Sequence, residues 1–100
     1  MRLMYAEIRE QMCEIARDMW ERRLTNAAGG NFAVRVGEDR ILVTPSLMSE
    51  RKHCRLHPED MLLIDSRENI LEGAGKLSRE TDMHILLLSG FRNIGATIHA

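Results

Sequence analysis

The order of the predicted elements constrains this chain more than any single motif: a helix, several short strands, a second helix and a last strand. In residues 4–20, apolar side chains recur at three- and four-residue steps, which places them on one face of a helix. The apolar face comprises Met4, Ile8, Met12, Ile15, Ala16, Met19 and Trp20, and the polar face comprises Arg9, Glu14, Arg17, Asp18 and Glu21. This order predicts a sheet that is covered by helices.

The first helix is predicted to end within TNAAGGN, residues 25–31, because Asn26, Gly29 and Gly30 tolerate the positive φ that ends a helix. The runs that follow are short, aliphatic and bounded by turn residues, as strands are. They lie at residues 31–36, 40–45, 61–65, 66–73 (a turn that leads into a strand) and 95–99. A short connection at 37–39 is predicted to join the first two as a hairpin.

Two further segments are predicted to contain helix. The polar stretch 46–60 is expected to hold one or two helical turns, with Pro58 at a first helical position. Residues 78–91 are expected to form a second amphipathic helix with Ser78 as its N-cap. The predicted buried stripe of this helix comprises Met83, Leu86, Leu87 and Phe91.

Length and composition favour one small domain without an extreme of charge. The chain has 100 residues, of which 44% are apolar and 29% are charged, and its formal net charge is −1. That balance gives no electrostatic reason to expect nucleic acid or an anionic membrane as a partner, and no stretch approaches the roughly 20 apolar residues of a membrane span. Cys13 and Cys54 form no CxxC pair and the N-terminus lacks a signal-peptide pattern, so we expect a cytoplasmic protein.

Candidate chemistry lies in three short motifs, and the first is GGN at residues 29–31. Glycines let a ligand approach backbone N–H groups closely, and a loop of this kind can hold a phosphate. A simple turn after a helix explains the same glycines, so both interpretations stay open.

The second motif is KLSRE at residues 76–80, at the predicted start of the second helix. Ser78 and Arg79 offer a hydroxyl and a planar cation where backbone donors and the helix dipole favour an anion. A capped helix start explains them equally. Glu80 and His84 are four residues apart and therefore share a face of the helix. They suit a metal pair, or alternatively a hydrogen bond or a partly buried histidine.

The third motif is HCRLH at residues 53–57, together with the histidine near the end of the chain. His53, Cys54 and His57 match no closed four-ligand zinc pattern, so a structural role is favoured for them. His99 stands at the end of the last predicted strand. Because residues i and i+2 of a strand point the same way, a histidine two positions later would pair with His99 on one metal.

Taken in order, these motifs resemble the N-terminal half of the class II aldolase/adducin family, which includes zinc-dependent fuculose- and rhamnulose-phosphate aldolases and ribulose-5-phosphate 4-epimerase. The matching stretches are GGNFAVRV (29–36), ILVTPS (41–46), LHPEDMLLID (56–65), LEG (71–73), KLSRETDMH (76–84) and IGATIHA (94–100). The resemblance implies an α/β fold in which helices pack on a mostly antiparallel or mixed central sheet, as a class II aldolase-like α/β/α sandwich.

The resemblance also implies roles for individual residues. Glu80 would be the acidic residue beside the metal and the general base, and His99 would be the first ligand of Zn²⁺ or another divalent metal. The residues implied to contact the phosphate of the substrate are Gly30, Asn31, Thr44, Ser46, Ser78 and Arg79. Two residues depart from the family pattern: Leu47 replaces a frequent glycine, which narrows access to the anion, and Arg79 replaces a serine.

The implied function is zinc-dependent retro-aldol cleavage of a ketose phosphate. A divalent metal stabilises the enediolate, a carboxylate carries the proton, and the phosphate anchors the substrate. The first alternative is a pentulose-phosphate 4-epimerase of the same family. The second is a non-catalytic adducin-like interaction or relic domain, and the third is an unrelated small α/β domain. By resemblance, the ligand is a phosphorylated sugar and the assembly is a homotetramer.

The family pattern continues after IHA with a second histidine, and a third lies much further along. We therefore expect residues 1–100 to be a partial N-terminal domain, cut within its metal motif and catalytically silent alone. We also expect its sheet to have an open edge and an uncovered face, so that the chain associates with itself or is marginally stable.

Overall fold

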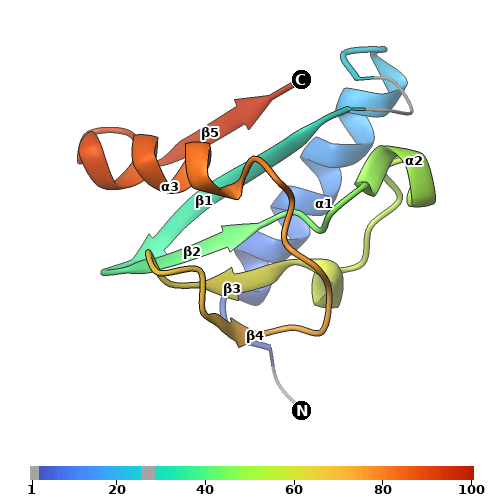
Figure 1. Ribbon diagram of the computed structural model, residues 1–100. Helices are drawn as coiled ribbons and strands as arrows, with labels where there is room; N and C mark the ends of the chain where they lie inside the picture. Colours follow the sequence, from blue (N-terminus) through green and yellow to red (C-terminus); the bar gives the residue numbers. More distant parts are fainter. Residues whose placement is uncertain (1–2, 26–28) are drawn as a thin grey trace.

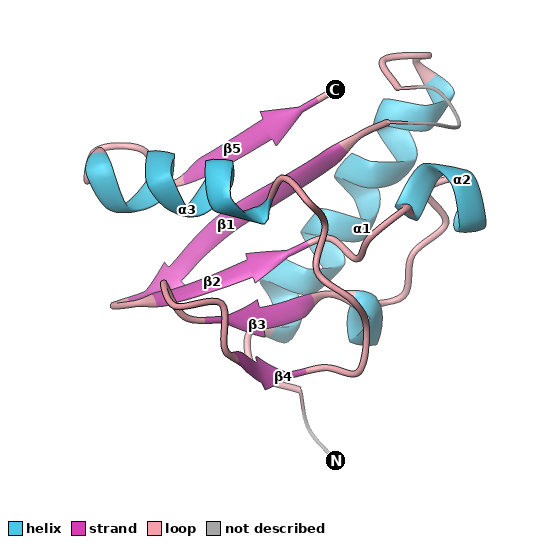
Figure 2. Cartoon of the chain, in the orientation of Figure 1, coloured by secondary structure: helices cyan, strands magenta, loops and turns pink. Residues whose placement is uncertain are grey.

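In the computed structural model, which describes residues 3–25 and 29–100, five strands form an antiparallel sheet with helices on both faces (Figures 1 and 2). The elements are α1 (Ala6–Glu21), β1 (Asn31–Gly37), β2 (Arg40–Val43), α2 (Met48–Lys52), the 3₁₀ helix η1 (Pro58–Asp60), β3 (Leu62–Ile64), β4 (Ile70–Glu72), α3 (Thr81–Gly90) and β5 (Ala96–His99). The strand order is β4-β3-β2-β1-β5, and each of these neighbouring pairs is antiparallel.

Helices α1 and α3 lie on opposite faces of the sheet (Figure 1), and an apolar cluster lies between the sheet and each helix. Successive side chains of β1 point to opposite faces of the sheet, so Phe32 belongs to the cluster on the α1 side and Ala33 to the cluster on the α3 side. Both are almost fully buried, at 1% and 0% exposed. The predicted α/β class, with helices on an antiparallel sheet, is confirmed. Within the described residues, no helix has the length and apolar character needed to cross a bilayer.

The α1 side contains the larger cluster. Its buried members are Met12, Ala16, Met19, Phe32, Leu42, Met48, Cys54, Leu56, Met61 and Leu63. The predicted apolar face of the first helix is therefore confirmed at its centre. It is wrong at Met4, which precedes the helix and is 52% exposed, and at Ile15, which lies at the margin of the stripe and is 39% exposed.

The prediction that Arg9 lies on the exposed face of α1 is wrong, because this side chain is fully buried. Its Nε donates to the carbonyl oxygen of Met4 at 2.7 Å, and its Nη1 donates to the carbonyl oxygens of Pro58 and Met61 at 3.0 Å each. Its Nη2 pairs with the carboxylate of Glu72. The guanidinium thus joins the start of α1 to η1, β3 and β4. Each of its three nitrogens has an acceptor, as a buried charge requires.

The predicted buried stripe of the second helix is wrong at Leu86 and Phe91, whereas Met83 and Leu87 are half-buried. The structure buries Thr81, His84 and Leu88, while Leu86 and Phe91 are 73% and 54% exposed. Residues 83–88 are apolar apart from His84, so the apolar pattern alone does not select a face. Polar contacts from His84 to the sheet decide which side of α3 faces inward.

The first helix ends at Glu21, earlier than the stretch 25–31 in which its end was predicted. Arg23 already has a positive φ of 58°. Gly30 has a φ of 102°, as its predicted turn role requires, and a Cβ there would lie 2.4 Å from Oγ1 of Thr25. Asn26, predicted to share that role, lies outside the described residues.

Two predictions about helix starts have different outcomes. Pro58 does occupy the first position of η1. Ser78 is not the N-cap of α3, because the helix begins at Thr81 with Glu80 as the preceding residue. Ser78 supports that start from two residues further back, since its hydroxyl accepts the N–H of Glu80 at 3.2 Å and its carbonyl accepts the hydroxyl of Thr81 at 2.8 Å.

Candidate functional site

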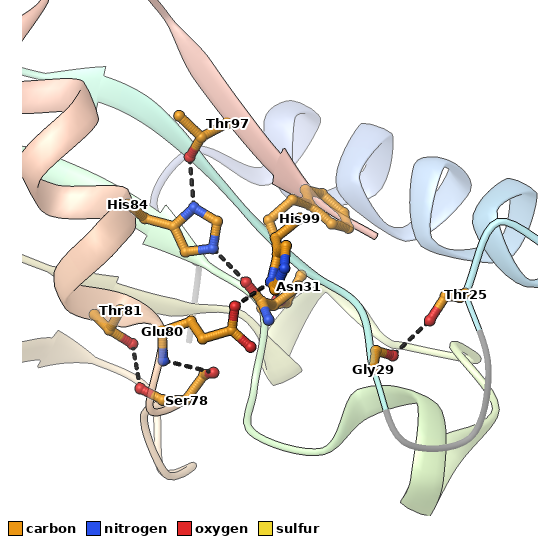
Figure 3. A network of polar contacts seen from close by, with 11 residues as sticks. Thr25, Gly29, Asn31, Ser78, Glu80, Thr81, His84, Thr97 and His99 are labelled. Carbon is orange, nitrogen blue, oxygen red and sulfur yellow. Dashed lines mark hydrogen bonds and ion pairs between the residues drawn. The ribbon is translucent and has the colours of Figure 1, made fainter.

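One end of the sheet brings together four of the predicted site residues, Asn31, Ser78, Glu80 and His99 (Figure 3). Asn31, the first residue of β1, is paired in register with His99, the last residue of β5. Directly paired residues of an antiparallel ladder point to the same face. That face is the one covered by α3, so Glu80, which precedes α3, lies beside both.

Glu80 and His99 are in contact. A carboxylate oxygen of Glu80, Oε2, meets Nδ1 of the His99 imidazole, and both side chains are partly exposed to solvent. They come from segments nineteen residues apart in sequence, joined through α3 and the turn before β5. A carboxylate oxygen and an imidazole nitrogen, both of which can bind a metal ion, therefore lie next to each other on an accessible surface.

His84 forms a second polar group behind this pair. Its Nε2 bonds to Oδ1 of Asn31, and its Nδ1 bonds to Oγ1 of Thr97 on β5 (Figure 3). His84 is 2% exposed, and burial lowers the pKa of its imidazole. Glu80 opposes that shift of the pKa and His99 adds to it. The lowered pKa favours the neutral ring, which is bonded to the neighbouring strands β1 and β5.

A cavity of about 420 Å³ opens beside Glu80. Its walls come from the start of β1, the loop after β2, the start of α2 and the loop before α3. The lining residues are Gly29, Gly30, Asn31, Pro45, Ser46, Leu47, Ser49, Glu50, Lys76, Leu77, Ser78, Arg79 and Glu80. Five of the six residues predicted to contact phosphate therefore share one cavity.

Backbone contacts hold the loops around the cavity. The N–H of Ser46 donates to the carbonyl of Lys76 at 3.0 Å, which joins the loop after β2 to the loop before α3. On the opposite side, Gly30 packs so closely that an added Cβ would lie 2.4 Å from Thr25 Oγ1 and 3.3 Å from Ser49 Oγ. The glycine is thus required by both its φ and its neighbours.

Thr44 is the predicted phosphate contact that the structure places elsewhere. It is 1% exposed and does not line the cavity. Its hydroxyl accepts the N–H of Phe32 at 3.1 Å, and its own N–H donates to the carbonyl of Phe32 at 3.1 Å. The side chain is therefore engaged with β1, and it supports the loop that contains Ser46.

The cavity combines cationic and anionic side chains. Lys76 and Arg79 lie in the same loop, while Glu50 and Glu80 contribute carboxylates. The two cations flank Ser78 and give the loop the composition of an anion site. Leu47 at the rim has a φ of 59°, a conformation that glycine adopts without strain and a branched side chain does not.

The family of this chain follows from its match to known proteins. Residues 10–100 match the family model described as the class II aldolase and adducin N-terminal domain. The chain belongs to this family. A solved structure of L-fuculose 1-phosphate aldolase superposes on it with a TM-score of 0.84 at 26% identity, covering 95% of this chain and 44% of the aldolase.

Curated relatives share the family and differ in their named reactions. The chain is 34% identical over 89 residues to methylthioribulose-1-phosphate dehydratase of Methylococcus capsulatus, covering 89% of this chain and 42% of that protein. It is 32% identical over 91 residues to 3-oxo-tetronate 4-phosphate decarboxylase of Haemophilus influenzae, covering 91% and 41%. The chain therefore spans less than half the length of these class II aldolase family relatives.

The Glu80–His99 pair suits a divalent metal by its chemistry, because zinc accepts both imidazole nitrogen and carboxylate oxygen. The fit is partial. Within the part of the chain that the structure describes, no group of three His, Cys, Asp or Glu side chains is placed to hold a metal ion. The pair therefore fits as two ligands of a larger set.

The HCRLH motif is divided among separate contacts. His53 stacks on Trp20, with ring centroids 4.9 Å apart and planes inclined by 17°. The thiol of Cys54 is buried, 3.2 Å from the hydroxyl of Ser49. The backbone N–H of His57 donates to the carboxylate of Asp60 at 2.8 Å, at the start of η1. Each of the three residues thus has a local structural contact.

Sequence reasoning missed one residue of the site and one contact, although its alternative of a hydrogen-bonded, partly buried His84 agrees with the structure, where this side chain is 2% exposed and bonded to Asn31 and Thr97. Lys76 lines the cavity, and its signal was available, because it stands three residues before Arg79 in the same motif. The contact of His84 with Asn31 had no local signal. The two residues are 53 apart in sequence and meet only because α3 lies across β1.

Proposed function

We propose that this chain supplies the phosphate-binding loops and two metal ligands of a divalent-metal-dependent sugar-phosphate aldolase. The observation that supports the proposal is that Glu80, which contacts His99, lines a cavity that is also lined by glycine, serine and cationic side chains. A phosphate and a reacting carbon chain need these two kinds of site next to each other.

The phosphate is held by groups that are complementary to an anion. Gly30 allows close backbone approach, Ser46 and Ser78 offer hydroxyls, and Arg79 offers a planar cation with several donors. Lys76 adds a second positive charge to the same loop. Binding of this remote group holds the carbon chain in place against Glu80, so its binding energy contributes to catalysis.

Glu80 and His99 act on the carbon chain. In a retro-aldol step, a substrate hydroxyl loses its proton, its oxygen forms the carbonyl of an aldehyde, and the electrons of the broken C–C bond pass to the other fragment. In this proposal the Glu80 carboxylate, whose side chain is 39% exposed, accepts that proton. A divalent cation held by Glu80 and His99 would stabilise negative charge that develops on substrate oxygens.

Self-association is part of the proposal. The relevant surface is β5, which pairs with β1 on one side and forms an edge of the sheet on the other. Ile98 on this strand is 59% exposed. An exposed strand edge with apolar side chains favours pairing with a further chain. Sedimentation at increasing concentration tests this: a dimer or tetramer supports the proposal, and a monomer throughout contradicts it.

The phosphate site is tested by NMR titration of the purified chain with inorganic phosphate and with dihydroxyacetone phosphate. We expect the amide signals of Gly30, Ser46, Ser78 and Arg79 to shift together and saturate. Addition of Zn²⁺ is expected to shift the ring signals of His99, and Glu80→Gln should weaken that effect. The proposal fails if both ligands leave the cavity signals unchanged.

The reaction class is tested with a chimera in which residues 1–100 replace the matching region of the Methylococcus capsulatus dehydratase. Release of dihydroxyacetone phosphate from a ketose 1-phosphate supports the aldolase. Interconversion of pentulose phosphates would favour a 4-epimerase. A folded chimera that binds phosphate and performs neither reaction would favour a non-catalytic role. Glu80→Gln in the same chimera is the matched control.

A further inference from the structure

We propose that His84 is a positioning residue that fixes the orientation of the Asn31 amide, so that the amide presents its nitrogen, a hydrogen-bond donor, to an anion in the cavity. His84 does not itself line that cavity. The inference rests on the proposed function in one respect, because the anion is taken to be the phosphate of the substrate.

The Asn31 side chain is held at its oxygen and accessible at its nitrogen. Its Oδ1 bonds to Nε2 of His84 (Figure 3). Its Nδ2 forms no hydrogen bond with the described residues, and among those residues every buried side-chain nitrogen or oxygen has a partner. Nδ2 is therefore within reach of solvent, although Asn31 as a whole is 7% exposed. Asn31 lines the cavity, so we infer that Nδ2 is exposed to the solvent inside the cavity.

A neutral imidazole can hold the amide in this way in one tautomer. Nε2 must carry the proton in order to donate to Oδ1 of Asn31, and Nδ1 must then accept. The hydroxyl of Thr97 meets Nδ1 and can donate its proton there in this tautomer. Burial, which lowers the pKa of His84, supports the neutral ring. Oδ1 of Asn31 faces Nε2, so the Nε2-protonated tautomer fits this orientation of the amide, and the Thr97 hydroxyl is compatible with it because it can donate to Nδ1.

The orientation determines whether Asn31 attracts or repels an anion. An amide donates at its nitrogen and accepts at its oxygen, and a phosphate oxygen is an acceptor. If the amide turned by half a rotation, its oxygen would face the phosphate oxygen, and these two acceptors would repel each other. The same rotation would direct the N–H groups of Nδ2 at the N–H of Nε2, so His84 opposes it.

Two substitutions of His84 separate this role from a merely structural one. In His84→Gln, the side-chain nitrogen occupies the place of Nε2 and can still donate to Asn31. In His84→Asn, the nitrogen occupies the place of Nδ1 and reaches only Thr97. Inorganic phosphate is the probe, and its affinity is measured by NMR titration of the chain.

We expect His84→Gln to bind phosphate within about twofold of the wild type and His84→Asn to bind about tenfold more weakly, because one hydrogen bond to a charged group is lost. Thermal melts show whether both variants fold. The inference is overturned if folded His84→Asn binds phosphate as the wild type does, or if the two variants are weakened equally.

The tautomer provides a test that needs no variant. Ring ¹⁵N shifts of wild-type His84 are expected to show the proton on Nε2, and a proton on Nδ1 would overturn the inference. Failure of the proposed function gives a different result. In that case the wild type binds no phosphate at the cavity, whatever the tautomer of His84.

Discussion

The two faces of the sheet differ in how they are held together. On the α1 side, ten of the described residues form an extended buried apolar cluster, and the main polar group there, Arg9, is enclosed by Glu72 and three carbonyl oxygens. On the α3 side, six of the described residues form a smaller buried apolar cluster. Beside that cluster, His84 meets Asn31 and Thr97, and the Glu80–His99 pair opens to solvent.

This difference separates stability from binding within one small sheet. A side chain buried among apolar groups contributes free energy of folding in proportion to the area that it removes from water. A site for an anion needs accessible polar groups, which contribute little to folding. We therefore expect substitutions on the α1 side to change the free energy of unfolding and substitutions around the cavity to change ligand affinity.

The largest expected effect is that of Arg9→Met. It would leave the Glu72 carboxylate and three carbonyl oxygens without their donor, and we expect the free energy of unfolding to fall by about 3–5 kcal/mol. Urea denaturation measures the change. Arg17→Met, an exposed position on the same helix, is the control and should change it by less than about 0.5 kcal/mol. Equal stability of the two variants would remove the distinction between the faces.

Arg79→Ala is the reciprocal variant on the cavity side. Loss of its charge-assisted hydrogen bonds should weaken the binding of inorganic phosphate about tenfold, with little change in the unfolding midpoint because Arg79 is exposed. Calorimetric titration measures the affinity. Arg92→Ala removes the same charge outside the cavity and should leave phosphate binding unchanged. Equal weakening by both variants would indicate a general charge effect.

A smaller effect is a pH dependence that originates on the α3 side. Burial lowers the pKa of folded His84 below its ordinary value of 6.5, while the unfolded chain titrates near that value. The unfolded state therefore binds more protons in this window, so the free energy of unfolding rises with pH. The stabilisation is complete above the unfolded pKa and is lost as the pH falls below it.

Thermal melts at pH 5 and pH 7.5 test this dependence. His84→Gln, which does not titrate, is expected to lose less stability at pH 5 than the wild type does. Glu80 and His99 face the same ring and remain in both proteins, so the difference between them reports His84. Identical pH profiles would mean that the pKa of His84 is not lowered by folding.

The smallest expected effect concerns the rim of the cavity. Leu47 is 45% exposed and has a φ of 59°, so Leu47→Gly relieves strain and sacrifices little burial. We expect a gain of a few tenths to about 1 kcal/mol in the free energy of unfolding, because the entropy of glycine in the unfolded chain offsets part of the relief. Leu47→Ala, which keeps the strain, should show no gain. Urea denaturation of the wild type, Leu47→Gly and Leu47→Ala measures the three free energies of unfolding.

Sequence reasoning reached the elements and the grouping of the site more reliably than the facing of side chains. The spacing of Met12, Ala16 and Met19 predicted the buried face of α1, because a strongly amphipathic pattern selects one side. The uniformly apolar α3 offered no such contrast, and its buried side was predicted wrongly. Arg9 was misplaced for a related reason, since a charge is usually exposed unless its partners, here distant in sequence, enclose it.

By itself, the sequence determined the order of helices and strands, the family, and the loops that contribute glycine, serine and arginine to one region. These follow from local periodicity and short motifs, which act within a few residues. Only the tertiary structure decided that His84 would turn inward to Asn31, that Thr44 would support its loop from behind, and that Glu80 would meet His99. Those contacts join segments far apart in the chain, so they exist only once the sheet has set its register and α3 has packed across it.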